Sequence, residues 1–250
     1  MLNDLLDAQA AIDWAVAQLP TLQARVEAWS NGPRYKLIFH PNKQLGKKII
    51  KLAEVQSIDS IINAEVGAII NSIRSSLDIL ITSIALRHGY TNTERTYFPI
   101  ARDRAQFLSF AGYKGCEAIK ALPDRERSII ENLEPWRGGN ATLVALHDLD
   151  IIRKHQRLID VRVTPWAIVI SPEDYRNGLE FAPVWRGFKN DAVIGWTGIN
   201  APDCNPQISL QIEFDETLSG SNKSLLATLR DFASLAHSII NIFDTLIGDE

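Results

Sequence analysis

The sequence is poor in cysteine, the residue on which disulfide frameworks and many metal sites depend. Its two cysteines, Cys116 and Cys204, are far apart and fit no metal-ligand spacing. This pattern favours two free thiols in a reducing compartment over a disulfide or a structural zinc site. We therefore predict a protein without a metal site.

The short motifs of common catalytic and nucleotide-binding sites are also missing. The chain has no Gly-Lys-Ser/Thr phosphate loop, no His-Glu-x-x-His, no Cys-x-x-Cys and no Gly-x-Ser-x-Gly elbow. We therefore expect no cofactor. No reaction can be assigned from the residues alone.

Basic residues are also fewer than acidic residues. The chain has 26 Lys and Arg residues against 30 Asp and Glu residues, so its formal net charge is −4. A protein that covers duplex DNA with its whole surface is usually basic, which argues against that class and leaves only a local basic patch open. The start, Met1 to Asp4, lacks the basic and apolar runs of a signal peptide, so we expect a cytoplasmic protein.

The segment from Ile58 to Leu86 organises the rest of the chain. It has no proline, and its apolar residues recur at steps of three and four: Ile62, Val66, Ile69, Ile70, Ile73, Leu77, Leu80, Ile81 and Ile84. This period predicts a helix with one broad apolar face. Because Glu65, Arg74 and Asp78 would be costly in hydrocarbon, we expect a buried helix and no membrane partner.

The remaining chain alternates between helical and extended patterns. We predict helices over 2–19 and 21–29, separated by Pro20, and over 103–122, 124–133, 142–155 and 225–246. We predict strands over 34–40, 47–54, 158–163, 167–170, 178–184, 192–197 and 207–214.

The first two strands form a hairpin that is too short to be stable alone. We expect it to join the later strands in one antiparallel sheet. The prediction is a single α+β domain over 1–250, mainly helical and closed by the C-terminal helix. Its helical part covers about 1–30, 55–156 and 222–247, and its sheet part covers about 34–54 and 157–215.

A polar stripe borders the apolar face of the 58–86 helix. It consists of Asn63, Gly67, Asn71, Arg74, Asp78 and Thr82, each three or four residues from the next. Arg74 and Asp78 are spaced i,i+4 and can touch. They are either an ion pair that orients neighbouring loops or a charged site in which Arg74 binds a phosphate or carboxylate.

A second polar cluster lies in the 142–155 helix and just after it. Asp150, Lys154 and Arg157 fall on one helical face, and Arg153, Lys154, His155 and Arg157 form a dense cationic patch. The patch either meets a phosphate or stabilises the C-terminal end of the helix. We expect the two polar helices to pack together, with Arg74 or Asp78 within reach of the 150–155 segment.

Tryptophans are a further candidate for a ligand face. Trp166, Trp185 and Trp196 lie in the predicted strand region. Residues of this kind in strands more often fill a sheet core, which is the interpretation we favour.

Both polar clusters resemble motifs of a large family of uncharacterised bacterial proteins. The motifs in this chain are Arg74-Ser75-Ser76-Leu77-Asp78-Ile79, Phe98-Pro99-Ile100 and Leu149-Asp150-Ile151-Ile152-Arg153-Lys154-His155-Gln156. The first is also similar to the Arg-x-x-x-x-His element of HEPN domains. The resemblance implies a helical, often dimeric module, either a metal-independent ribonuclease of toxin or defence systems or a non-catalytic relative.

The chain departs from these motifs where catalysis would occur. Ile79 stands where the histidine is expected, and Arg153 and Gln156 replace the acid and the arginine of the later motif. Isoleucine cannot transfer a proton. A catalytic role would then pass to His155 or His88, acting with Arg74.

Three hypotheses follow from the residues and the resemblance. The leading one is a degenerate, non-catalytic HEPN-like module that dimerises and binds RNA, a nucleotide or a protein. Its candidate binding residues are Asn71, Arg74, Asp78, Asp150, Arg153, Lys154 and His155. The alternatives are a metal-independent ribonuclease using Arg74, Lys154 and His155, and a purely structural subunit.

Overall fold

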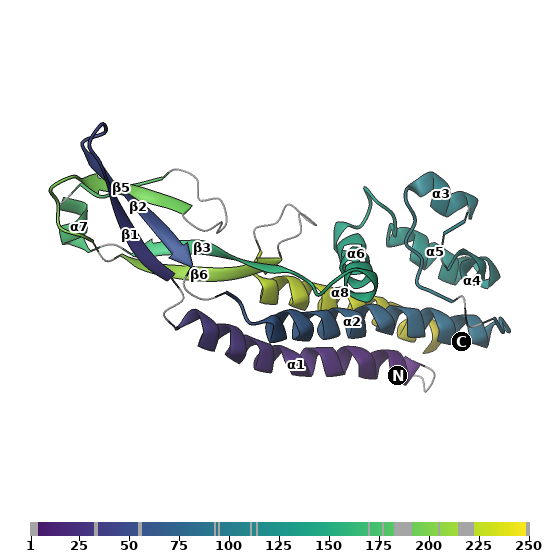
Figure 1. Ribbon diagram of the computed structural model, residues 1–250. Coiled ribbons are helices and arrows are strands. Elements are labelled where there is room, and N and C mark those ends of the chain that lie inside the picture. Colours follow the sequence, from purple (N-terminus) through teal and green to yellow (C-terminus); the bar gives the residue numbers. More distant parts are fainter. Residues whose placement is uncertain are drawn as a thin grey trace.

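A computed structural model describes residues 5–32, 35–54, 57–92, 94, 96–110, 112–113, 115–169, 171–176, 178–182, 192–204, 206–214 and 223–248. It shows an α+β protein with helices at one end and antiparallel sheets at the other (Figure 1). The helices are α1 (Leu6–Ser30), α2 (Ser60–Arg87), α3 (Arg104–Ser109), α4 (Cys116–Ala121), α5 (Asp124–Asn132), α6 (Ala141–His155), α7 (Pro172–Arg176) and α8 (Leu225–Gly248). The strands are β1 (Tyr35–Asn42), β2 (Lys47–Glu54), β3 (Val161–Val169), β4 (Glu180–Phe181), β5 (Ala192–Gly198) and β6 (Gln207–Phe214).

Helix α2 is the centre of the helical core, as its period predicts. Its nine apolar positions named above are buried, and the helix packs against α1, α8 and α6 (Figure 1). The Asp59 carboxylate accepts a hydrogen bond from the Ile61 amide at the N-terminus, and Gly89 adopts φ +80° just after the C-terminus. By length and hydropathy α2 would pass for a membrane span, and its apolar face lies in this core.

Helix α1 continues through Pro20, so the predicted break there is wrong. Proline removes one backbone N–H, which leaves the Val16 carbonyl without its helical partner. Pro20 and Val16 are both exposed, so water can reach that side of the helix. The buried stripe through Leu19 and Leu22 continues in phase, and its burial holds the helix together across the proline.

The strands form two sheets, and the prediction of one sheet is wrong. One sheet has the order β1-β2-β5-β4, and the other consists of β3 paired with β6. Leu37, Phe39, Ile50 and Leu52 of the first sheet share a hydrophobic cluster with Ile168, Ile208 and Leu210 of the second. The sheets therefore stack face to face, and the β3-β6 pair extends from this cluster into the helical core through Val163, Ile212 and Phe214.

Strand β3 covers the two short strands that we predicted as separate. Its pairing with β6 shifts register between Pro165 and Ala167, and this bulge accommodates a proline that cannot donate to the ladder. Trp166 is 66% exposed, so its assignment to a sheet core is wrong. Trp196 is half-buried on β5, and Trp185 lies outside the described residues.

The predicted 103–122 helix is divided into α3 and α4. Phe110 has φ 52°, and Gly112 and Gly115 have φ +69° and +88°, which no α-helix accommodates. Gly115 also lies directly against the Tyr97 carbonyl, so that a Cβ at this position would overlap the carbonyl oxygen. The close approach positions the segment that carries Phe98.

We expect Gly115→Ala to lower the free energy of unfolding by about 1–3 kcal/mol more than Gly112→Ala does. Both substitutions place a side chain at positive φ, with a similar backbone penalty. Only Gly115 adds overlap with a backbone atom, whereas nothing lies within 4 Å of a Cβ at Gly112. Urea unfolding of the two variants measures the difference, and equal losses would contradict the close packing at Gly115.

Candidate functional site

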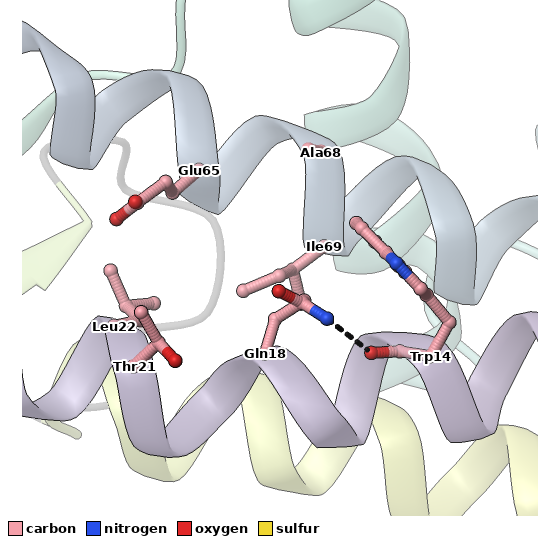
Figure 2. Close-up of a pocket in the computed structure, with 7 residues that line it drawn as sticks. All are labelled: Trp14, Gln18, Thr21, Leu22, Glu65, Ala68 and Ile69. Atoms are coloured by element: carbon pink, nitrogen blue, oxygen red, sulfur yellow. Dashed lines mark hydrogen bonds between the residues drawn. The ribbon is translucent and has the colours of Figure 1, made fainter.

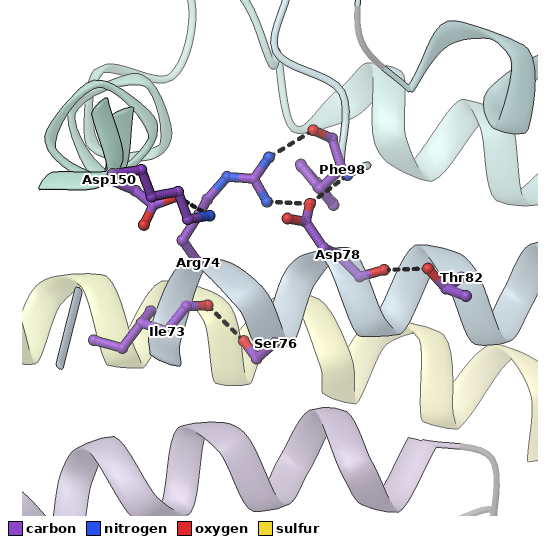
Figure 3. Close-up of polar contacts among 8 residues, drawn as sticks. Ile73, Arg74, Ser76, Asp78, Thr82, Phe98 and Asp150 are labelled. Carbon is purple, nitrogen blue, oxygen red and sulfur yellow. Dashed lines mark hydrogen bonds and ion pairs between the residues drawn. The ribbon is translucent and has the colours of Figure 1, made fainter. Parts of the chain in front are cut away.

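Arg74 lies in a buried polar cluster between α2 and the segment that follows it (Figure 3). One terminal nitrogen donates to Asp78 Oδ1 at 2.5 Å, and the other donates to the Phe98 carbonyl at 2.9 Å. The Phe98 amide donates to the same Asp78 oxygen at 2.7 Å. We call Arg74, Asp78 and the Phe98 backbone the Arg74 clamp.

The clamp confirms the predicted i,i+4 contact and identifies what it holds. Arg74 is 4% exposed at its side chain and Asp78 is 21% exposed. A guanidinium at that depth needs both a counter-charge and hydrogen-bond acceptors, and the clamp supplies both. Arg74 therefore ties the Phe98 segment to α2, and its two terminal nitrogens already have protein acceptors.

A second polar cluster joins α6 to α2, so the predicted packing of these helices is confirmed. Arg153 donates to Asn71 Oδ1 at 2.7 Å. Gly67 makes room for this side chain, because a Cβ there would lie 3.0 Å from Arg153 Cγ and Cδ. Figure 3 shows Asp150 on the side of α6 that faces α2.

Asp150 is the acid at the centre of this second cluster. It is 4% exposed and pairs with Lys154 Nζ at 2.6 Å. Its other oxygen, Oδ1, lies 3.7 Å from Arg153 Nε, and both of these buried atoms lack a hydrogen bond among the described residues. We call Asn71, Asp150, Arg153 and Lys154 the Asp150 group. In this group one carboxylate faces two cations.

The other candidate residues lie away from these clusters. His155 is exposed at the last position of α6. Arg157 comes after the helix has ended and pairs with Asp160, so its predicted place on the Asp150 face is wrong. His88 lies 3.1 Å from the buried carboxylate of Glu126 on α5.

His147 is the functional candidate that we did not single out from the sequence. It lies one helical turn before Asp150 on α6, and its ring is half-buried. Desolvation, with a further contribution from the positive charge of Arg74, lowers the pKa of His147 from 6.5 to about 4, although Asp148 and Asp150 oppose the shift. The i,i+3 spacing of His147 from Asp150 is the sequence feature that could have identified it.

A separate hollow lies between α1 and α2 on another side of α2 (Figure 2). Its volume is about 160 Å³, and Trp14, Leu22, Ala68 and Ile69 are among its lining residues. The one carboxylate in the lining, Glu65, is paired with Arg25 at 2.9 Å. Of the other polar lining residues, Gln18 donates to the Trp14 carbonyl at 3.3 Å, so Gln18 and Glu65 both already have protein partners.

In the part of the chain that the structure describes, no group of three or more His, Cys, Asp or Glu side chains could hold a metal ion.

A scan against protein-family models and searches of curated proteins and solved structures find no match to this chain. The HEPN resemblance therefore stays a prediction that rests on the motif residues.

We expect Arg74→Ala to lower the free energy of unfolding by about 3–5 kcal/mol, because it leaves Asp78 and the Phe98 carbonyl without their buried partner. Arg25→Ala is the matched control. The Arg25–Glu65 pair is 43% and 27% exposed, and its loss should cost less than about 1 kcal/mol. Denaturation of both variants and of Arg74→Ala/Asp78→Ala measures these losses. Wild-type stability in Arg74→Ala would contradict the clamp.

His147 should make the protein less stable as the pH falls. In the unfolded chain His147 takes up a proton near pH 6.5, whereas in the folded chain it does so only near pH 4. The free energy of unfolding should therefore fall between these values, by about 3 kcal/mol at the full shift. Urea unfolding across the window should give a shallower slope for His147→Gln than for wild type or His155→Gln. An unchanged slope in His147→Gln would contradict the buried neutral ring.

Proposed function

We propose that this chain is a non-catalytic HEPN-like module that acts by binding a phosphate-bearing ligand. One observation carries the non-catalytic part of the proposal. Arg74, the arginine of the motif that resembles the HEPN element, is buried, and both of its terminal nitrogens donate to protein acceptors. An arginine in this state holds the fold and has no exposed face for a scissile phosphate.

The proton-transfer groups around Arg74 support the same conclusion. Ile79 packs against the helical core at the position where the HEPN motif has histidine. Metal-independent RNA cleavage needs one group that takes the 2′-hydroxyl proton and another that protonates the leaving oxygen, at a pKa near the working pH. His147 has a pKa of about 4, so near neutrality it is a weak base and carries no proton to donate.

The remaining cations of the predicted site are engaged or distant. Lys154 is bound to Asp150, and Arg153 is bound to Asn71. His155 is exposed at the end of α6. A metal-independent ribonuclease would require these groups to leave their partners, and the position of His147 near Arg74 is the observation that favours this second candidate.

Dimerisation belongs to the proposal through the HEPN resemblance. Large apolar side chains are exposed on α1 and α8: Leu6 and Trp14 on α1 and Ile242 on α8 are 46%, 47% and 43% exposed, and Trp14 also lines the hollow between α1 and α2. These helices are the surface that we propose for a second copy.

We expect purified protein to show no cleavage of labelled RNA in EDTA. Arg74 has no exposed face, and His147, with a pKa of about 4, carries no proton to donate at neutral pH. The assay compares wild type with His147→Ala, His155→Ala and Arg74→Lys, the last chosen to keep a charge at the clamp.

Cleavage by wild type that survives gel filtration and disappears in His155→Ala or His147→Ala would contradict the proposal and establish the ribonuclease. Cleavage that persists in all three variants would point to a contaminant, and repeated purification of wild type would then decide the result. Absence of cleavage throughout supports the non-catalytic part of the proposal.

A further inference from the structure

The β1-β2 hairpin is basic in an acidic protein. Residues 35–54 contain five lysines, Lys36, Lys43, Lys47, Lys48 and Lys51, and one acid, Glu54. The whole chain has a net charge of −4, so a net charge of +4 in the hairpin leaves −8 on the rest. The positive charge is therefore concentrated on one element, at the sheet end of the molecule (Figure 1).

The strand register separates the two faces of the four-stranded sheet. Leu37 pairs with Leu52 and Phe39 with Ile50, and all four belong to the cluster beneath the sheet. Because side chains alternate along a strand, the residues between them point to the other side. Ile38 is paired with Lys51, His40 with Ile49, and Ile49 in turn with Trp196 of β5.

This second side is the outer face of the sheet. It carries Lys36, Ile38, His40, Lys47, Ile49, Lys51, Val193 and Trp196, and Glu180 of β4 at its edge. Lys36 and His40 are exposed, and Ile38, Ile49, Lys51 and Trp196 are half-buried. Glu180 on this face is paired with Lys47 at 2.6 Å. The outer face therefore combines lysine charge with a half-buried indole and aliphatic side chains.

We propose that the outer face binds single-stranded RNA. Lys36 on this face and Lys43 in the adjoining hairpin turn are exposed and neutralise phosphates, and a base stacks on the Trp196 ring beside Ile49. Strands such as these present side chains at regular intervals on a flat surface, which suits a flexible strand with its bases turned out. The inference deepens the proposed function, because it gives the phosphate-bearing ligand a class and a surface apart from the Arg74 clamp.

The charge on the outer face argues against a second copy of the chain as its occupant. A two-fold symmetric contact through this face would place lysines opposite lysines. Pairing of β1 edges is also disfavoured, because β1 ends the sheet and carries Lys36 and Pro41. The carboxylates of an acidic peptide would make no favourable contact with the apolar side chains between the lysines. A nucleobase, in contrast, can stack on the Trp196 ring.

Fluorescence anisotropy with a labelled oligouridylate of about 12 nucleotides tests the proposal. We expect Lys36→Gln/Lys43→Gln to weaken binding by about tenfold or more at low salt, and to reduce the slope of log affinity against log salt by about 1.4 for two lost contacts. Arg104→Gln/Lys120→Gln is the matched control, because it removes two charges from α3 and α4 at the helical end. It should leave both quantities close to wild type.

Trp196→Leu separates stacking from charge. It should weaken binding by about fivefold or more and leave the salt slope unchanged. Thermal unfolding shows that each variant is folded, and the lysine pair decides the question if Trp196→Leu is not. No binding of wild type at low salt, equal weakening in the control pair, or equal competition by polyglutamate would overturn the proposal. None of these results changes the cleavage assay, so the two proposals fail separately.

Discussion

The buried guanidinium of Arg74 is the constraint on which the helical half depends. A charge with 4% exposure is tolerated only with a counter-charge and filled acceptors, and Asp78 and Phe98 provide them. The clamp fixes the Phe98 segment on α2, and Gly115 closes against Tyr97 from the other side. The same positive charge contributes to keeping His147 neutral. One interaction thereby holds a loop on α2 and contributes to the protonation state of a histidine on α6.

The sequence predicts the parts of this fold that local pattern controls. The period of α2, the β1-β2 hairpin and the spacing of Arg74 from Asp78 are all found in the structure. The errors concern tertiary structure. Pro20 remains inside α1 because the buried stripe continues through it, and β3 with β6 forms its own sheet because its apolar side chains meet those of the first sheet. Neither effect is local in sequence.

The candidate site shows the same division. Arg74, Asp78, Asp150 and Lys154 were identified from charged residues on helical stripes, and the structure places each in an ion pair. Whether these pairs bind a ligand depends on burial, which a helical period does not report. His147 was missed because its altered pKa arises mainly from desolvation. The lysines of the outer face are separated along β1 and β2, and pairing of the strands gathers them.

Hydrogen exchange at the Phe98 amide tests most directly whether Arg74 holds the protein itself. This amide donates to Asp78 inside the clamp, so the account predicts slow exchange in wild type. Exchange should accelerate in Arg74→Met and stay slow in Arg25→Met, which removes a half-exposed pair. Fast exchange at Phe98 in the wild-type protein, or slow exchange that Arg74→Met leaves unchanged, would contradict the account.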